Sequence, residues 1–206
     1  MSGLVMSGLA LNFPPVRLEA ADAVLYPAAL GGADALFEAV MAAVDWRQEE
    51  LTLYGRRIPQ PRLSAWYGDA AYAYSGLRLE PRPWPPVLAD LRNRCAEIAQ
   101  APFNSVLANL YRDGADSMDW HSDDEASLGP APVIASVNLG TPRRFQLRRK
   151  NDKKIKIEIS LGGGDVLVMG ERCQILWQHR VPKTQAAVGP RVNLTFRNVV
   201  RAPTRP

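Results

Sequence analysis

The chain has 206 residues, 47% hydrophobic and 22% charged, which suits one compact domain with a substantial core. No stretch is long enough to cross a bilayer and no basic export signal precedes Phe13, so we expect a single domain over residues 1–206 without a membrane partner. Cys95 and Cys173 are too few for a disulfide framework, which favours an intracellular protein, cytoplasmic in a bacterium or nuclear and cytoplasmic in a eukaryote.

The N-terminal half contains two helical patterns. Residues 1–33 are interrupted by prolines and end in a glycine pair, so we expect an irregular arm there. A helix is predicted over residues 34–46, where apolar residues recur at helical spacing and Asp34 can serve as the N-cap. A second helix is predicted to start at the Pro85-Pro86 pair and to stop before Pro102. Its apolar stripe consists of Leu88, Leu91, Cys95 and Ile98.

The remaining segments indicate a mostly β protein with flanking helices. Residues 51–86 are rich in Tyr, Trp, Arg, Pro and Gly, and we expect loops and short strands there, as in many binding surfaces. After Pro102 the apolar pattern changes to a period of two, in short runs separated by turn signals. This pattern predicts a β-sandwich or jelly roll. The predicted strands are 105–111, 133–139, 144–149, 155–161, 165–169, 175–179 and 191–199.

A metal site is suggested by His121, Asp123 and His179. In extended backbone, residues two apart project from the same face, so His121 and Asp123 can meet one ion. His179 can supply the third ligand. Two histidines and one carboxylate form the facial triad of oxygen-activating Fe(II) enzymes, which leaves positions open for a co-substrate and O₂. A lone His-x-Asp is also common in surface turns, but this chain has only two histidines and both fit the triad.

The segment 191–197 alternates polar and apolar residues. Its odd positions are Arg191, Asn193, Thr195 and Arg197, whereas its even positions are apolar. A buried face with two arginines is costly unless an anion meets it, and the dicarboxylate 2-oxoglutarate is such an anion. An exposed edge strand would show the same alternation, but the sequence has no matching acidic stripe. On the strand 105–111, Asn109 and Tyr111 share a face and could bind the same acid, or could be ordinary core residues.

A basic run lies between Arg143 and Lys156, where Asp152 is the only acid. Such a run suits a phosphate backbone, and it equally suits a solvated hairpin. The net charge of +4 permits a nucleic-acid partner without requiring one. The basic residues are Arg143, Arg144, Arg148, Arg149, Lys150, Lys153, Lys154 and Lys156.

Two motifs resemble the AlkB family of dealkylating dioxygenases. The residues from Asn109 through Gly114 to Glu125 resemble its Asn-x-Tyr to His-x-Asp block, and 191–197 is similar to its Arg-x-Asn-x-x-x-Arg signature. The resemblance runs from about Tyr54 to Val200 and is strongest to the human homologues that repair DNA and RNA. It implies a double-stranded β-helix (jelly roll) core over 103–200, with an N-terminal helical extension and a nucleotide-recognition lid over 51–86.

The resemblance also implies an activity and its residues. Fe(II), 2-oxoglutarate and O₂ would be used by a monomer to remove alkyl groups from bases of DNA or RNA, with release of formaldehyde from a methyl group. His121, Asp123 and His179 would hold the iron. Arg191 would pair with the distal carboxylate of 2-oxoglutarate and Asn109 and Tyr111 would hydrogen-bond it, whereas Asn193 and Arg197 would support the metal-binding end.

The substrate residues follow from the same resemblance. Segments 61–68 and 72–76 resemble the lid, and their candidates are Arg62, Tyr72, Tyr74 and Ser75. Tyr74 would stack on a flipped base opposite His121, and Glu125 would contact the polar edge of the base. Tyr72 and Tyr74 could instead pack the lid onto the barrel. Tyr54 stands where a duplex-preferring relative carries an aromatic finger, although the following residues resemble a relative that favours single strands and RNA, so strand preference stays open.

Two other functions fit the motifs. The first is an oxygenase of the same kind that acts on protein or a small molecule, against which the lid aromatics and the basic run argue. The second is a non-enzymatic reader of modified nucleic acid. The complete triad and the two arginines argue against a loss of catalysis in such a reader. Neither the preferred lesion nor the choice between DNA and RNA can be inferred from the residues.

Overall fold

The computed structural model describes residues 13–53, 56–69, 72–74 and 77–200. Within this part of the chain most residues of regular structure lie in strands, and every strand pairing is antiparallel. The strands are β1 (Val16–Leu18), β2 (Ala23–Tyr26), β3 (Glu50–Leu53), β4 (Arg56–Pro59), β5 (Leu63–Gly68), β6 (Tyr72–Tyr74), β7 (Leu77–Leu79), β8 (Ser105–Tyr111), β9 (Met118–His121), β10 (Ile134–Gly140), β11 (Arg143–Arg149), β12 (Lys156–Leu161), β13 (Asp165–Met169), β14 (Trp177–Val181) and β15 (Arg191–Arg197).

Two sheets face each other across an apolar core. The large sheet has the order β1-β2-β13-β10-β15-β8-β5 and the small sheet has the order β12-β11-β14-β9. The core between them includes Leu107 and Tyr111 from the large sheet, and Phe145, Leu147 and Trp177 from the small sheet. The predicted jelly-roll core is therefore confirmed. β15 lies between β10 and β8 in the large sheet, so it is a central strand and not an exposed edge strand.

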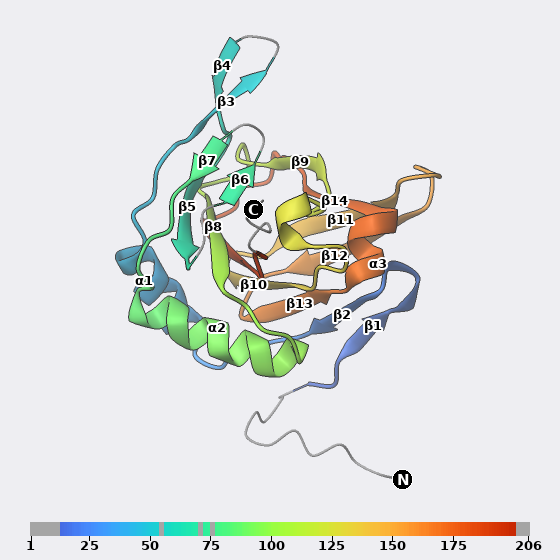
Figure 1. Ribbon diagram of the computed structural model, residues 1–206, viewed down its shortest axis with the longest axis horizontal. Helices are drawn as coiled ribbons and strands as arrows, with labels where there is room; N and C mark the ends of the chain where they lie inside the picture. Colours follow the sequence, from blue (N-terminus) through green and yellow to red (C-terminus); the bar gives the residue numbers. More distant parts are fainter. Residues whose placement is uncertain (1–12, 54–55, 70–71, 75–76, 201–206) are drawn as a thin grey trace, which may run out of the picture.

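Two helices cover the outer face of the large sheet (Figure 1). α1 (Ala33–Ala43) and α2 (Pro86–Ala99) pack there over a second apolar core, to which the even positions of β15 contribute. The predicted stripe of α2 is confirmed, because Leu88, Leu91, Cys95 and Ile98 are its buried residues. The predicted cap of α1 was wrong: Gly32 is its N-cap, in the left-handed conformation that glycine adopts without strain, and Asp34 lies inside the first turn.

The predicted irregular arm also needs correction. Its residues 16–26 form β1 and β2, and β2 extends the large sheet by pairing with β13. Between these two strands lies the short 3-10 helix η1 (Glu19–Ala21). The segment is bonded to α3 (Glu171–Leu176), because Asp22 accepts hydrogen bonds from the amides of Gly170 and Arg172. The prolines that suggested irregular structure lie outside the two strands.

Other strand predictions also differ from the structure, among them 191–199, which ends at Arg197. The predicted strand 175–179 starts only at Trp177, because Ile175 and Leu176 belong to α3. β9, which ends at His121, was not predicted at all. Residues 51–86 are also not all peripheral, since β5 pairs with β8 as a buried strand of the large sheet. The hairpins β3–β4 and β6–β7 lie outside both main sheets, and β3–β4 projects from the body of the protein in Figure 1.

Candidate active site

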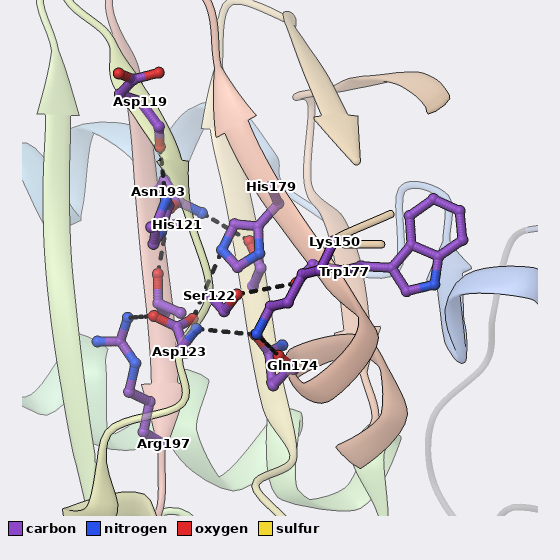
Figure 2. A network of polar contacts seen from close by, with 12 residues as sticks. Asp119, His121, Ser122, Asp123, Lys150, Gln174, Trp177, His179, Asn193 and Arg197 are labelled. Atoms are coloured by element: carbon purple, nitrogen blue, oxygen red, sulfur yellow. Dashed lines mark hydrogen bonds and ion pairs between the residues drawn. The ribbon is translucent and has the colours of Figure 1, made fainter. Parts of the chain in front are cut away.

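The three candidate metal ligands meet between the two sheets (Figure 2). His121 ends β9, Asp123 follows it by two residues, and His179 lies on β14 directly opposite His121 in the strand register. One potential ligand atom from each residue lies within 4.8 Å of the others. Asp123 and His179 are buried, whereas His121 is partly exposed. The cluster therefore has a closed side and a side that faces solvent.

Local hydrogen bonds orient His121. Its Nδ1 lies 2.8 Å from the carbonyl oxygen of Asp119, which accepts a hydrogen bond from the Nδ1–H group and leaves Nε2 with a free lone pair. The ring centroids of His121 and His179 lie 4.2 Å apart, and Phe145 stacks on His179. The Nε2 atom of His179 is 3.8 Å from Oδ2 of Asp123, which is too long for a hydrogen bond. These two atoms are thus side by side without bonding each other.

Asp123 is held by its neighbours at two atoms. Its Oδ1 accepts a 2.7 Å hydrogen bond from Nη2 of Arg197, and its amide donates to Oε1 of Gln174. Its Oδ2 is buried without a hydrogen-bond partner. A buried carboxylate oxygen without a donor is costly, and a cation would remove that cost. We therefore find that the site fits a metal ion, since the remaining oxygen of Asp123 and two imidazoles are the ligands that Fe(II) oxygenases use.

The titration of these groups suits a metal site. Burial raises the pKa of Asp123, but the charge and hydrogen bond of Arg197 together with the neighbouring His179 and His121 outweigh this effect, and the net pKa falls to about 2. Burial lowers the pKa of His121, and burial together with the neighbouring His121 lowers the pKa of His179 to about 3. At neutral pH the carboxylate is therefore charged and both imidazoles are neutral. This is the protonation state in which all three bind a metal.

The polar face of β15 forms a second wall of the site. Arg191, Asn193, Thr195 and Arg197 are all buried, as the alternation of the sequence suggested. Asn193 donates to Ser136 Oγ and the Val137 carbonyl oxygen. The amide oxygens and hydroxyls around this strand are therefore held in fixed positions by β10. The neighbouring β8 places Asn109 opposite Asn193 and Tyr111 opposite Arg191.

Arg191 is a buried cation without a carboxylate partner in the described part of the chain. It is 1% exposed, and its Nη2 donates to Oδ1 of Asn138, while Nε and Nη1 make no hydrogen bond. The Tyr111 ring centroid lies 5.0 Å from its guanidinium carbon. Burial lowers the pKa of Arg191, because desolvation disfavours the charged form. Two unbonded donors at this position would suit an anion with two oxygens.

A cavity that is partly open to solvent joins the metal cluster to these polar residues. Arg191 is not among its lining residues and lies behind Tyr111, which does line it. An anion reaching Arg191 would therefore approach past the phenol. The lining residues are Leu107, Asn109, Tyr111, Met118, His121, Asp123, Ser136, Phe145, Met169, His179, Arg180, Val181, Asn193, Thr195 and Arg197.

The candidate substrate residues are less completely described. Tyr54 and Ser75 lie outside the described residues, and for Tyr72 and Tyr74 only the backbone is described, as the two ends of β6. Glu125 is half-buried and immediately precedes the 3-10 helix η2 (Ala126–Leu128). The structure thus leaves the stacking assignment of Tyr74 as an expectation.

Arg62, a candidate substrate residue of the predicted lid, is buried. It is 3% exposed, and its Nε donates a 2.7 Å hydrogen bond to Oδ1 of Asn109. Asn109 in turn lines the cavity. Arg62 therefore fixes the amide of Asn109, which leaves the Nδ2 group of this amide to face other partners.

The basic run divides into residues with different environments. Arg143 is buried and donates to three backbone carbonyl oxygens, those of Asp113, Asp116 and Pro182, so it holds loops together. Lys150 pairs with Asp124. The exposed members lie on β11, β12 and their connection: Arg144, Lys153, Lys154 and Lys156. Only part of the run is therefore free to meet an external phosphate.

Sequence reasoning missed several residues that support the ligands. They include Asp119 and Gln174, which bond His121 and Asp123, and Asn138, which bonds Arg191. The segment after His121 is also fixed by Ser122, whose hydroxyl donates to the Trp177 carbonyl oxygen (Figure 2). These are common residue types whose partners lie far away in the chain. The sequence carried no spacing signal that could have paired them.

Comparison with known proteins agrees with this geometry. The family model of the 2OG-Fe(II) oxygenase superfamily matches residues 23–197. Mouse DNA oxidative demethylase ALKBH2 is 37% identical over 180 residues, which cover 82% of this chain and 75% of that protein. The chain belongs to the AlkB family of 2OG-Fe(II) oxygenases. The predicted family and cofactors are therefore confirmed: Fe(II), 2-oxoglutarate and the O₂ that an oxygenase uses.

Two further relatives extend the comparison. Mouse alpha-ketoglutarate-dependent dioxygenase alkB homolog 3 is 45% identical over 190 residues, which cover 87% of this AlkB-family chain. The alignment covers 66% of that relative, so the chain spans slightly less than two thirds of its length. The solved structure of OsALKBH1 superposes with a TM-score of 0.66 at 16% identity, over 90% of this chain and 100% of that one, and supports the fold. In the described part of the chain, no helix has the length and hydropathy to span a membrane.

Proposed function

We propose that this AlkB-family protein is a dioxygenase that removes alkyl groups from nitrogen atoms of bases in DNA or RNA. The observation that carries the proposal is the meeting of His121, Asp123 and His179 in one cavity with the polar face of β15. The relatives support the substrate class, since one is named a DNA oxidative demethylase and another a dioxygenase of the alkB type. We expect the protein to act as a monomer, in a compartment that holds nucleic acid.

His121, Asp123 and His179 would hold the iron. When bound, iron and 2-oxoglutarate together supply the oxidising power for hydroxylation of an alkyl group by O₂. The protein contributes a preformed set of ligands in the correct protonation state. Arg197 keeps Asp123 ionised and directs Oδ1 away from the open position, so that Oδ2 faces the neighbouring Nε2 of His179. The ligands therefore need little rearrangement to accept a metal.

Arg191 would bind the distal carboxylate of 2-oxoglutarate. Its unbonded Nε and Nη1 groups and its buried, unneutralised charge support this assignment. Tyr111 lies between Arg191 and the cavity and would add a hydrogen bond from its hydroxyl, while Asn109 would offer its amide. Asn193 would support the metal-binding end of the co-substrate from the same face of β15. These residues would thus contact both ends of a short dicarboxylate and orient it.

The substrate would enter from the side on which His121 is partly exposed. We infer that the hairpin β6–β7 belongs to a lid over this entrance, with Tyr74 stacking on a flipped base and Glu125 contacting its polar edge. Arg62 would act through Asn109 and not by direct contact with nucleic acid. Arg144, Lys153, Lys154 and Lys156 are exposed and would contact phosphates. Tyr54 stays a candidate for an aromatic finger.

A turnover panel tests this proposal. Purified protein with Fe(II) would be given oligonucleotides that carry 1-methyladenine or 3-methylcytosine, single-stranded or duplex and of DNA or RNA, and formaldehyde and succinate would be measured. We expect both products in a one-to-one ratio, neither without 2-oxoglutarate, and neither from His179→Ala. Methylated peptides form the comparison arm. Formaldehyde from peptides but not from oligonucleotides would refute the substrate class, and demethylation that persists in His179→Ala would refute the site.

A further inference from the structure

β9 carries His121 but is held weakly by its backbone. It is an edge strand of the small sheet, and its pairing with β14 is described at two positions, His121 opposite His179 and Met118 opposite Val181, with an irregularity between them. The amide of Trp120 donates to the side chain of Asp119. The described register with β14 therefore covers only the two ends of β9, and a bulge or irregularity separates them.

Side chains hold the middle of the strand instead. The guanidinium carbons of Arg148 and Arg180 lie 4.1 and 4.4 Å from the ring centroid of Trp120. Arg148 comes from β11 and Arg180 from β14, so the indole joins three strands of the small sheet. Both distances are well inside the range in which a cation is attracted to an aromatic ring. We call Trp120, Arg148 and Arg180 the tryptophan clamp.

The two arginines of the clamp are themselves fixed. Arg148 donates from Nε and Nη2 to Oε1 of Gln178, and Arg180 donates from Nε to Oε1 of Gln146. Gln146 continues the chain of contacts to Glu158 on β12. Because glutamines and not carboxylates orient the two guanidinium groups, their charge toward the indole is not neutralised by these bonds. The clamp is therefore rigid on the side away from β9.

Two residues of the tryptophan clamp are sequence neighbours of the two candidate histidine ligands. Trp120 precedes His121, and Arg180 follows His179 and lines the cavity. Any rotation or shift of β9 against β14 would change the separation of the two imidazoles, whose centroids now lie 4.2 Å apart. The indole between two anchored arginines opposes such a shift.

We propose that Trp120 is a positioning residue for the metal site, and that its stacking against Arg148 and Arg180 fixes the place of His121 relative to His179. This inference rests on the proposed metal-binding role of the two histidines. It assigns to the clamp an effect on metal affinity and coordination geometry in the absence of any nucleic acid. Residues that support metal ligands typically change metal affinity by about 10–100-fold when they are replaced.

The experiment measures binding of Co(II) to the metal-free protein under anaerobic conditions, by titration and by the visible absorption bands that report coordination geometry. Four variants are compared with the wild type: Trp120→Leu, Trp120→Phe, Arg148→Met and His121→Ala. Arg92→Met is the matched control, because Arg92 also lies over an indole, that of Trp84, with 5.0 Å between its guanidinium carbon and the ring centroid, but on the helical side of the protein. Urea unfolding of each metal-free variant shows which proteins are folded.

We expect Trp120→Leu and Arg148→Met to weaken Co(II) binding by on the order of tenfold and to change the visible bands at saturation. Trp120→Phe retains a ring and should recover most of the affinity, and Arg92→Met should bind like the wild type. If Trp120→Leu does not fold, Arg148→Met decides the matter, because it keeps the indole. A generic loss of stability would not alter the spectrum of the saturated protein.

The outcomes separate the two levels of the proposal. Co(II) affinity and bands that stay unchanged in both Trp120→Leu and Arg148→Met, while His121→Ala loses binding, would leave the metal site intact and overturn the clamp. Unchanged binding in His121→Ala would overturn the metal site and the clamp together. An equal loss in Arg92→Met would show that removal of any stacked arginine has this effect, and would also overturn the clamp.

Discussion

Arg191 and Arg197 lie at opposite ends of the same face of β15, and both are almost fully buried, but their surroundings differ. Arg197 pairs with Asp123 at 2.7 Å. Arg191 has no carboxylate partner in the described part of the chain, and two of its nitrogen atoms make no hydrogen bond. The positive charge of Arg197 is therefore neutralised by a candidate metal ligand, whereas that of Arg191 stays without an anionic partner among the described residues.

The largest expected effect lies at the Arg197 end. Asp123→Asn keeps the shape of the side chain but replaces the anionic oxygen that faces His179. We expect turnover to fall by more than about 100-fold, since even residues that only support a metal ligand change activity by 10–100-fold. Formaldehyde release from a methylated oligonucleotide measures the loss. Asp90→Ala, a change of an exposed carboxylate on α2, is the control and should leave turnover unchanged.

Removing the other partner of the same pair should chiefly affect stability. Arg197→Met leaves the buried Asp123 carboxylate without its cation, which typically costs about 3–5 kcal/mol. We expect urea unfolding of the metal-free protein at pH 7 to show this loss, and added Mn(II) to restore part of it. If metal-free Arg197→Met were as stable as the metal-free wild type, the ion pair with Arg197 would not explain why Asp123 is ionised.

The same pair predicts a pH dependence with a defined sign. The folded-state pKa of Asp123 is about 2, below its ordinary value of 3.8. The pair therefore stabilises the folded protein fully above about pH 4, and this contribution disappears as the pH falls toward 2. We expect the difference in unfolding free energy between wild type and Arg197→Met to shrink over that interval. A difference that stayed constant from pH 7 to pH 3 would contradict the assignment.

The Arg191 end should respond in the opposite way. Arg191→Met removes a buried cation that has no anionic partner in the described residues, so the metal-free protein should be as stable as the wild type or more so. The concentration of 2-oxoglutarate that gives half-maximal turnover should rise by roughly 10–150-fold, the value of a hydrogen bond to a charged group. Arg191→Lys keeps the positive charge but not the planar guanidinium. Its half-maximal concentration of 2-oxoglutarate should therefore lie between those of the wild type and Arg191→Met.

Thermal unfolding tests whether 2-oxoglutarate binds at Arg191 without a measurement of turnover. A ligand present at about 100 times its dissociation constant stabilises a folded protein by about 2.7 kcal/mol. With Mn(II) in place of iron, 2-oxoglutarate should raise the unfolding temperature of the wild type but not that of Arg191→Met. An equal rise in both proteins would place the carboxylate elsewhere.

The smallest effect concerns the histidines. The lowered pKa values of His121 and His179 keep both rings neutral at pH values where an ordinary histidine, with a pKa near 6.5, would be half protonated. Protons should therefore compete little with the metal above pH 6. We expect the affinity for Mn(II) to be nearly constant from pH 8 to pH 6. A tenfold fall for each pH unit below 6.5 would show that a histidine titrates normally.

The contrast between regular and irregular segments also explains what could be predicted from the sequence. β8, β13, α2 and the polar face of β15 were predicted with accurate or nearly accurate bounds, because regular backbone pairing imposes a period on the residues. The candidate metal ligands could be predicted for a different reason, because the chain has only two histidines and both fit the triad.

β9 and the supporting residues could not be found in this way. Met118–His121 has only four residues and none of them is fully buried, so its alternation is too short to distinguish a strand from a loop. The partners Asp123 and Gln174 are 51 residues apart. The strands β1 and β2 were missed because their pairing, β1 with β2 and β2 with β13, forms only in the folded chain. Contacts of this kind depend on tertiary packing and leave no local pattern.

The hydrogen bonds between Asp22 and α3 connect β1 and β2, the first described strands, to the candidate metal site, although these strands lie far from its residues in the sequence. The carboxylate of Asp22 accepts from the amide of Arg172 at the start of α3, and the indole of Trp177 donates to the Ala20 carbonyl oxygen at its end. The same short helix presents Gln174 to Asp123. A fragment that began after residue 26 would therefore keep every candidate metal ligand but lose one of the contacts that position the Asp123 carboxylate.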